Sequence, residues 1–290
     1  MPNQVARTSI EKSRPRFVDR CCNVCGCCES EELLAMNGTA YHCCVQCGSI
    51  YSRPMVDNLI EINDENYEIT HEKYVKKALS QRARIRKKLR MFERYRKTGN
   101  FIELGCNTGG VVLAAQDNGW NAAGVDISNA ATRYARDELG LEVFTGMLEE
   151  AAYPANYFDV VYSNSVMEHL AYPLQVLQEV YRILRPGGVF YADTVNWKSY
   201  TREILGANWR YIDPADHVHL YTPDNVASMA SLAGFEVERI WTTGVRVTAN
   251  AAESTFVTPW YLFLFKGVLS IATRFTKKGD AIKFLLRKPY

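Results

Sequence analysis

The chain has 290 residues, 47% of them hydrophobic and 23% charged, and a formal net charge of +2 at pH 7. This composition excludes a disordered or fibrous protein, and no run of about 20 apolar residues predicts a membrane span. Residues 1–20 are polar and basic, where a secretory signal has an apolar core. We therefore expect a flexible basic tail over 1–20 and a cytoplasmic protein.

Cysteines are concentrated near the N-terminus, where eight of the nine lie between positions 21 and 47. Without a secretion signal, such clustering indicates metal binding rather than disulfides. The units Cys22-Asn-Val-Cys25-Gly and Cys44-Val-Gln-Cys47-Gly are separated by 18 residues, the spacing of a four-cysteine zinc site. Four thiolates fill a tetrahedral site, so we predict a zinc ribbon over residues 21–55 in which zinc is structural.

Four further cysteines flank these ligands. We interpret them as spare thiols, although a register that uses Cys25 and Cys28 stays open. A segment of about 35 residues cannot build an adequate apolar core, so metal binding would supply its folding free energy. The flanking residues are Cys21, Cys27, Cys28 and Cys43.

A linker and a basic amphipathic helix are expected over residues 56–98. After a loop near 54–63, apolar residues recur at helical spacing over 71–97. Residues 72–97 hold 12 of the 34 Lys and Arg residues and two acids. The basic residues form a solvated face in one interpretation and contact a phosphate or another anionic substrate in the other.

From residue 100, short apolar runs alternate with helical patterns. This alternation predicts a parallel sheet with helices on both faces, in a domain over 99–290 that carries an atypical insert at about 245–279. Such sheets bind ligands outside the carboxyl ends of their strands. The runs lie at 101–104, 123–127, 143–145, 158–163, 189–195, 235–241 and 281–286.

The first run ends in an acid and a glycine-rich turn, Glu103-Leu-Gly105-Cys-Asn107-Thr-Gly109. Alone, such a turn is a weak indication shared by several nucleoside sites. Asp126 ends the second run, 21 residues after Gly105, where a carboxylate can accept hydrogen bonds from both ribose hydroxyls. Together the two features indicate a nucleoside cofactor, without separating a nicotinamide dinucleotide from S-adenosylmethionine.

A longer series of motifs resembles class I S-adenosylmethionine-dependent methyltransferases and covers most of residues 95–242. Later motifs resemble the subgroup that often bears an N-terminal zinc ribbon and modifies saccharides or related small metabolites. The resemblance implies a Rossmann-like α/β fold with a seven-stranded, mostly parallel sheet, and S-adenosylmethionine and zinc as cofactors. The motifs lie at 101–110, 124–127, 158–161, 167–170 and 184–188, and then at 195–196, 206–209, 217–221 and 234–235.

The resemblance also implies a cofactor site. Asp126 would hold the ribose, Ile127 would pack on the adenine and Glu103 would lie near the methionine end. Ser163 and Asn164 would face the sulfonium. The implied cofactor residues are Glu103, Gly105, Asn107, Gly109, Asp126, Ile127, Ser163 and Asn164.

Two positions depart from the family pattern. Asn107 replaces a usual glycine, but Asn is the residue after glycine that best tolerates a left-handed backbone, so the turn can survive. Met147 stands near a usual acid that would bond the adenine amine. Glu149 or a main-chain group would then make that contact.

Methyl transfer to a hydroxyl needs alignment of the reactants and removal of a proton, usually by a histidine at neutral pH. Among five histidines, we predict His217 as the base, with His169 as the alternative base or an acceptor ligand. Trp209 and Tyr221 nearby would suit stacking on a sugar. Asp159 is assigned to structure.

Residues 255–278 are rich in aromatic and basic side chains, and the aromatic stretch 255–265 is too short to span a bilayer. Three interpretations stay open for this part of the insert: a lid over the acceptor pocket, a dimer contact, and a peripheral membrane anchor.

The leading hypothesis is O-methylation of a sugar or a sugar-bearing small metabolite. The alternative is an RNA methyltransferase that uses the ribbon and the basic helix to bind nucleic acid. The mildly acidic remainder of the chain and the absence of a base-stacking module weigh against RNA. A cofactor-binding protein without catalysis and a dehydrogenase fit the motif series less well.

Overall fold

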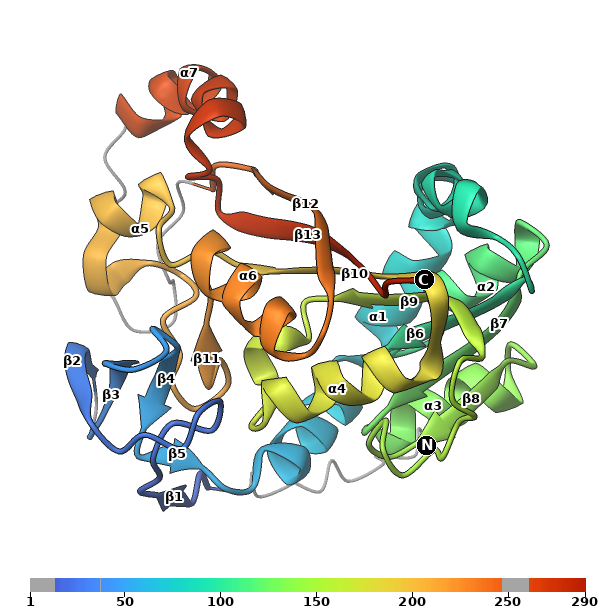
Figure 1. Cartoon of the computed structure of the whole chain (residues 1–290), viewed down its shortest axis with the longest axis horizontal. Coiled ribbons are helices and arrows are strands. Elements are labelled where there is room, and N and C mark those ends of the chain that lie inside the picture. The colour runs from blue at the N-terminus through green and yellow to red at the C-terminus, as the bar shows by residue number, and fades with distance from the viewer. Residues whose placement is uncertain (1–13, 37, 247–260) are drawn as a thin grey trace, which may run out of the picture.

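The computed structural model describes residues 14–36, 38–246 and 261–290, and its centre is a seven-stranded sheet (Figure 1). The strand order is β12-β13-β10-β9-β6-β7-β8, and β13 alone runs antiparallel to its neighbours. All seven predicted runs are strands of this sheet, so the predicted Rossmann-like α/β fold is confirmed. They are β6 (Asn100–Leu104), β7 (Asn121–Asp126), β8 (Glu142–Thr145), β9 (Phe158–Asn164), β10 (Leu184–Val195), β12 (Glu236–Thr243) and β13 (Ala281–Arg287).

Helices cover both faces of this sheet. Successive residues of a strand point to opposite faces, so Phe101 joins the core under α1 and α2 while Ile102 joins the core under α4 and α6. The helices are α1 (Leu59–Leu89), α2 (Gly110–Asp117), α3 (Asn129–Asp137), α4 (Pro173–Ile183), α5 (Tyr200–Leu205), α6 (Pro223–Leu232) and α7 (Tyr261–Thr276), with 3-10 helices η1 (Arg90–Tyr95), η2 (Met167–His169) and η3 (Gly206–Asn208).

The basic helix differs from its prediction at both ends. α1 begins at Leu59, so the second half of the predicted loop near 54–63 is helix, and the last residue of α1 is followed by η1. Two of its basic side chains are used inside the protein: Arg82 bonds Asp117 at 2.6 Å, and the half-buried Lys88 donates to the Tyr162 hydroxyl at 2.7 Å. Arg82 and Lys88 therefore have partners within the protein, which neither interpretation of the basic residues predicts.

The N-terminal segment forms a second, antiparallel sheet in the order β11-β4-β3-β2. One strand, β11, comes from the later part of the chain, so the two sheets are joined. Ser52 N also donates to the Val218 carbonyl at 2.9 Å. The strands are β2 (Ser30–Met36), β3 (Thr39–Cys44), β4 (Ile50–Arg53) and β11 (His219–Leu220), with a small separate pair β1 (Phe17–Val18) and β5 (Met55–Val56).

A buried ion pair fixes the amino end of β9. Asp159 pairs with Arg185 and accepts the backbone N–H groups of Lys97 and Gly99 at 2.9 and 2.7 Å. Burial alone would raise the pKa of Asp159, but Arg185 and these N–H groups outweigh burial and hold the pKa below its usual value. The geometry is that of a structural residue.

The insert is described in part. Its helix α7 packs on β12, where the Thr242 hydroxyl donates to the Thr273 carbonyl at 3.2 Å, and Val268, Ile271 and Phe275 are exposed. Phe256 and Trp260 lie outside the described residues. No helix of the described ranges is long and apolar enough to cross a membrane.

Candidate functional site

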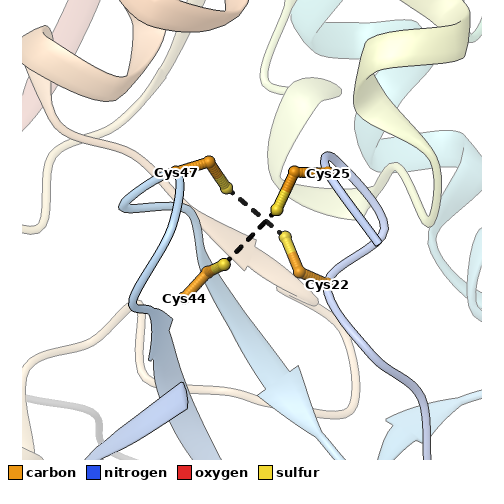
Figure 2. A group of neighbouring side chains, drawn as sticks. All are labelled: Cys22, Cys25, Cys44 and Cys47. Carbon is orange, nitrogen blue, oxygen red and sulfur yellow. Dashed lines mark hydrogen bonds between the residues drawn. The ribbon is translucent and has the colours of Figure 1, made fainter. Parts of the chain in front are cut away.

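The four predicted zinc ligands point toward one another from two loops (Figure 2). Their Sγ atoms all lie within 4.8 Å of one another, with 3.5 Å between Cys22 and Cys47 and 3.5 Å between Cys25 and Cys44. A tetrahedral zinc with bonds of about 2.3 Å places its sulfur ligands about 3.8 Å apart. This thiolate cluster (Cys22, Cys25, Cys44 and Cys47) therefore fits a zinc ion.

The two loops of the thiolate cluster have the same hydrogen bonds. Gly26 N donates to the Cys22 carbonyl at 2.8 Å, and Gly48 N donates to the Cys44 carbonyl at 2.9 Å. Both glycines have positive φ, +76° and +70°, which a side chain would strain. The predicted reason for a glycine after each second cysteine is thus met.

Backbone N–H groups also point at the sulfurs. Burial alone would raise the pKa of Cys44, but the N–H groups of Cys47 and Gln46 outweigh burial and lower the pKa to about 7. The thiolate is the form that binds metals, and the donors favour it at Cys44, whereas burial raises the pKa of Cys22 and raises that of Cys25 to about 11.

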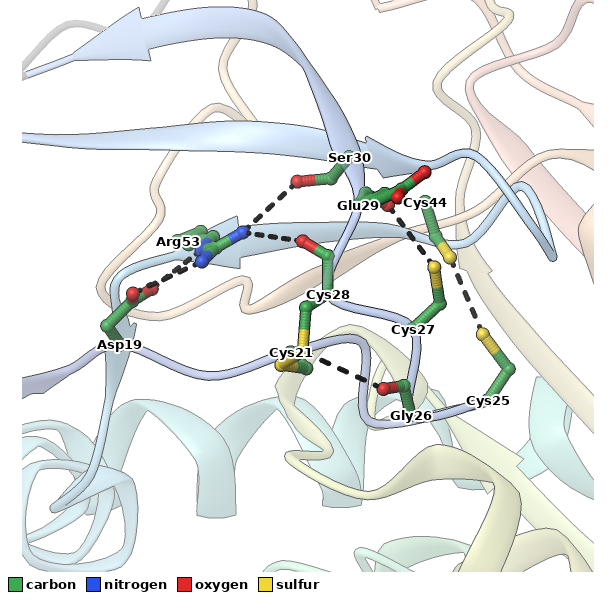
Figure 3. The surroundings of a disulfide bond; sticks show 10 residues. All are labelled: Asp19, Cys21, Cys25, Gly26, Cys27, Cys28, Glu29, Ser30, Cys44 and Arg53. Atoms are coloured by element: carbon green, nitrogen blue, oxygen red, sulfur yellow. Dashed lines mark hydrogen bonds and ion pairs between the residues drawn. A yellow bond between two sulfur atoms is a disulfide. The ribbon is translucent and has the colours of Figure 1, made fainter.

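One prediction about the cysteines is wrong. Cys21 and Cys28 are not spare thiols but form a disulfide that brackets the first loop (Figure 3), which also excludes the register using Cys28 as a ligand. Arg53 donates to the Cys28 carbonyl at 3.1 Å and pairs with Asp19 at 2.6 Å beside it. The spacing of the cysteines in the sequence does not distinguish such a bridge from free thiols.

The glycine-rich turn after β6 has the strained geometry expected of a cofactor turn. Gly105, Asn107 and Gly109 all have positive φ, of 72°, 50° and 77°. A Cβ at Gly105 would collide with Val166, and one at Gly109 would collide with Leu141. The turn therefore has no room for a side chain at Gly105 or Gly109. Asn107 adopts the left-handed conformation as predicted.

Asp126 ends β7 beside this turn. Its two carboxylate oxygens accept the backbone N–H groups of Asn107 at 2.7 Å and Ser128 at 2.9 Å. A carboxylate has about four lone-pair positions, so each oxygen keeps one for a ligand hydroxyl. Burial raises the pKa of Asp126.

Two polar atoms near the turn are buried without a partner among the described residues: Oε2 of Glu103 and Oγ of Ser163. Burial, and next the charge of Asp126, hold the pKa of Glu103 well above its usual value. Buried polar groups are nearly always bonded, so these atoms point to a polar ligand. Their side chains point to opposite faces of the sheet, because Tyr162 lies opposite Glu103 and Leu104 lies opposite Ser163.

The other predicted cofactor residues lie along the same edge of the sheet. Ile127 is half-buried after β7, and Asn164 is the exposed last residue of β9; Met147, which stands near the family's usual acid, is 45% exposed after β8. At that last turn, Glu150 rather than Glu149 accepts the Met147 N–H, at 2.7 Å.

The two candidate bases lie together, although 47 residues separate them in the chain. The rings of His169 and His217 are 4.9 Å apart between centroids. His169 Nδ1 lies 3.0 Å from the carbonyl oxygen of Asp216 and 3.0 Å from its Oδ1, and His217 Nδ1 lies 2.9 Å from the Tyr211 carbonyl. A carbonyl accepts a hydrogen bond, so each ring carries an N–H on Nδ1, and Nε2 takes no part in that contact.

Asp216 also sets the charge of its neighbour. Burial alone would lower the pKa of His169, but the Asp216 carboxylate outweighs burial and raises the pKa to about 9.

Glu168 completes this group, which we call the imidazole cluster (Glu168, His169 and His217). One ligand atom of each residue lies within 4.8 Å of the others. Glu168 is 2% exposed, and its Oε2 accepts the Thr194 hydroxyl at 2.7 Å. The cluster borders the cofactor turn because Val166, which would meet a side chain at Gly105, starts the segment that holds it.

The predicted stacking aromatics are wrong. Trp209 is 0% exposed and Tyr221 is 1% exposed, and the Tyr221 hydroxyl donates to the Met167 carbonyl at 2.9 Å. Both belong to the core and offer no ring face to an acceptor.

A protein family described as a methyltransferase domain matches residues 73–240, more than half of the chain. The chain belongs to this methyltransferase family. The match contains the cofactor turn, Asp126 and the whole imidazole cluster.

Individual methyltransferases are similar over shorter stretches. A ubiquinone biosynthesis O-methyltransferase of Thiobacillus denitrificans is 30% identical over 154 residues, 48% of this chain and 65% of that protein. A malonyl-[acyl-carrier protein] O-methyltransferase of Enterobacter lignolyticus is 28% identical over 43% of this chain and 50% of that protein. The chain thus matches less than two thirds of the length of these relatives.

Solved structures show the same fold. An S-adenosylmethionine-dependent methyltransferase of Archaeoglobus fulgidus superposes with a TM-score of 0.52 at 19% identity, covering 71% of this chain and 94% of that one.

Proposed function

We propose that this methyltransferase uses S-adenosylmethionine to methylate a hydroxyl oxygen of a small molecule. One observation carries the proposal: the strained turn at Gly105 and the imidazole cluster meet at the carboxyl edge of the main sheet, through Val166. An edge of this kind is where open parallel sheets bind ligands. The O-methyltransferase names of the relatives agree with an oxygen acceptor.

The residues of the edge fit the cofactor. Asp126 would accept hydrogen bonds from the ribose hydroxyls, with Ile127 against the adenine. The unpartnered Oε2 of Glu103 would receive the amine at the methionine end, and Ser163 and Asn164 would face the sulfonium. S-adenosylmethionine, when bound, supplies a methyl group whose carbon–sulfur bonding pair stays on sulfur while an acceptor lone pair forms the carbon–oxygen bond.

The chain's own contribution is alignment and proton removal. In its simplest form, Nε2 of His217 accepts the hydroxyl proton, because Nδ1 of that ring is held by the Tyr211 carbonyl. His169 is bonded to Asp216 and would hold the acceptor beside it.

We further propose that the thiolate cluster binds one structural zinc ion. Four ligands leave no open position for a substrate, and the buried Cys22 and Cys44 belong to the hydrophobic core that also contains residues of the main sheet. The ribbon, the linker with α1, and the domain from residue 99 would then be the functional units of the chain.

The acceptor class stays a proposal. The saccharide subgroup rests on the motif series, and it loses the support of stacking rings because Trp209 and Tyr221 are buried. A screen with methyl-labelled cofactor against sugar hydroxyls, phenols, vicinal diols and mixed RNA tests it. Transfer to a small hydroxyl compound that disappears in Asp126→Ala supports the proposal, and transfer only to RNA, lost at moderate salt, overturns it.

A further inference from the structure

The imidazole cluster combines three side chains of a kind that bind metals. Each offers one ligand atom within 4.8 Å of the others, and in the described part of the chain the thiolate cluster is the only other such group. Two ligands come from η2 and the third from the loop before β11. The cluster lies where the acceptor would be bound, so a cation there would contact the acceptor and affect methyl transfer as well as folding.

The two histidines are already oriented as metal ligands. Metal-binding histidines nearly always donate their second ring N–H to a carbonyl or a carboxylate. His217 Nδ1 lies 2.9 Å from the Tyr211 carbonyl, and His169 Nδ1 lies 3.0 Å from Asp216. Both rings therefore present Nε2, and the Nε2 of His217 is 3.9 Å from Asp216 Oδ2, too far for a hydrogen bond.

Glu168 supplies the anionic ligand. It is 2% exposed and held by the Thr194 hydroxyl, which comes from β10. Among the described residues, no ion pair joins Glu168 to a lysine or an arginine. A buried carboxylate is costly unless it is paired or coordinates a metal, so a cation shared with His169 and His217 would stabilise Glu168.

We infer that Glu168, His169 and His217 bind one divalent cation. The inference rests on the proposed function for its consequence, though the cation site itself stands on the geometry. Two nitrogens and one carboxylate oxygen suit Mn²⁺, Fe²⁺, Co²⁺ or Zn²⁺, and three ligands leave positions open. Those positions would take two neighbouring oxygens of the acceptor, which identifies a vicinal diol, a catechol or an α-hydroxyketone as the acceptor class.

A bound cation also changes how the proton is lost. Its charge lowers the pKa of a hydroxyl that it binds, so that the proton leaves to water and the oxygen lone pair is free to form the bond to the methyl carbon. The lone pair of His217 Nε2 then serves the cation and cannot take the proton. The cation thus replaces the direct base.

The test measures Mn²⁺ binding to the zinc-loaded protein by electron paramagnetic resonance. Mn²⁺ prefers oxygen and nitrogen ligands and competes poorly for thiolates. Glu168→Gln and His169→Asn should each lower Mn²⁺ affinity by more than about 100-fold, and Asp216→Asn by about 10- to 100-fold because it only orients His169. His42→Asn, in the ribbon, should bind Mn²⁺ as the wild type does.

Each variant should keep one zinc and its cofactor affinity, which shows that it is folded. The inference is overturned if the wild type does not bind Mn²⁺, or if Glu168→Gln binds Mn²⁺ as tightly as the wild type. Methyl transfer by the chelator-treated enzyme would then identify His217 as the direct base. Mn²⁺ binding with the expected pattern but no methyl transfer to any screened acceptor would support the cation site and refute the proposed function.

Discussion

The thiolate cluster and the imidazole cluster differ in what their ligands leave open. Four sulfurs face one another in the ribbon, whereas three nitrogen and oxygen ligands meet at the edge of the main sheet. The first arrangement can hold an ion but leaves no position for a substrate, whereas an ion in the second arrangement would keep positions free for a substrate. A closed site suits folding and an open site suits chemistry, and we propose that the two clusters divide these tasks.

The two clusters are nevertheless linked by the ribbon sheet. The Tyr41 hydroxyl, on β3, donates to the His217 carbonyl at 2.8 Å, and β11 pairs with β4 two residues further on. The ribbon thus holds the loop that presents His217. Loss of the closed site should weaken the open one, while loss of the open site should leave the closed one intact.

The largest expected effect is that of Cys47→Ser. Structural zinc contributes about 10–16 kcal/mol of apparent binding free energy in zinc-finger peptides, so the variant should lose its ion and the ribbon should unfold. Because the ribbon holds His217, kcat should fall as well. Metal analysis should give one zinc per chain for the wild type and for Cys27→Ser, whose thiol is free. The reverse pattern would show that the ligand assignment is wrong.

His217→Asn changes the imidazole cluster and should leave the thiolate cluster intact. Loss of the proton acceptor, or of a cation ligand, should lower kcat by about 100- to 10,000-fold. Zinc content and cofactor affinity should stay at wild-type values. If His217→Asn keeps full kcat while His169→Asn loses it, His169 is the base and His217 is not.

Asp126→Ala should disable the cofactor turn without touching either cluster. Two hydrogen bonds to a charged acceptor contribute about 1.5–3 kcal/mol each, so cofactor affinity should fall by about 100- to 10,000-fold. Calorimetry measures this loss, with zinc content as the control. Unchanged affinity would remove Asp126 from the site.

The sequence predicts the closed cluster better than the open one, for a physical reason. Cys22 and Cys25 share one short loop, so their spacing alone reveals a site. His169 and His217 are brought together only by the fold, and the sequence names them as alternatives rather than neighbours. Asp216 and Glu168 were missed, since an acid beside a histidine is common in loops. The positions of the central strands β6, β9 and β10 along the chain were predictable because each is a largely buried apolar run.

Asp159→Asn tests whether a charged residue distant from both clusters is structural. Removing one partner of a buried pair costs about 3 kcal/mol, since Arg185 is left with less compensation. The pKa of Asp159 is lowered in the folded protein, so this stability is present above the usual aspartate pKa and is lost as pH falls through the folded value. Denaturant unfolding should show a constant difference from the wild type above about pH 5 that narrows on acidification. A difference that does not change with pH would contradict the ion pair.

The smallest expected effect is that of Tyr41→Phe, which removes one hydroxyl from the link between the clusters. Tyr41 is 0% exposed, and the lost hydrogen bond to the His217 carbonyl is worth about 1 kcal/mol. If the ribbon positions His217, kcat should fall about fivefold while zinc content, cofactor affinity and KM stay unchanged. Thr39→Val is the matched control, because its hydroxyl on the same strand donates at 2.9 Å to the Pro54 carbonyl and not to the His217 loop. Equal losses of kcat in the two variants would mean that the ribbon contributes general stability and does not position the imidazole.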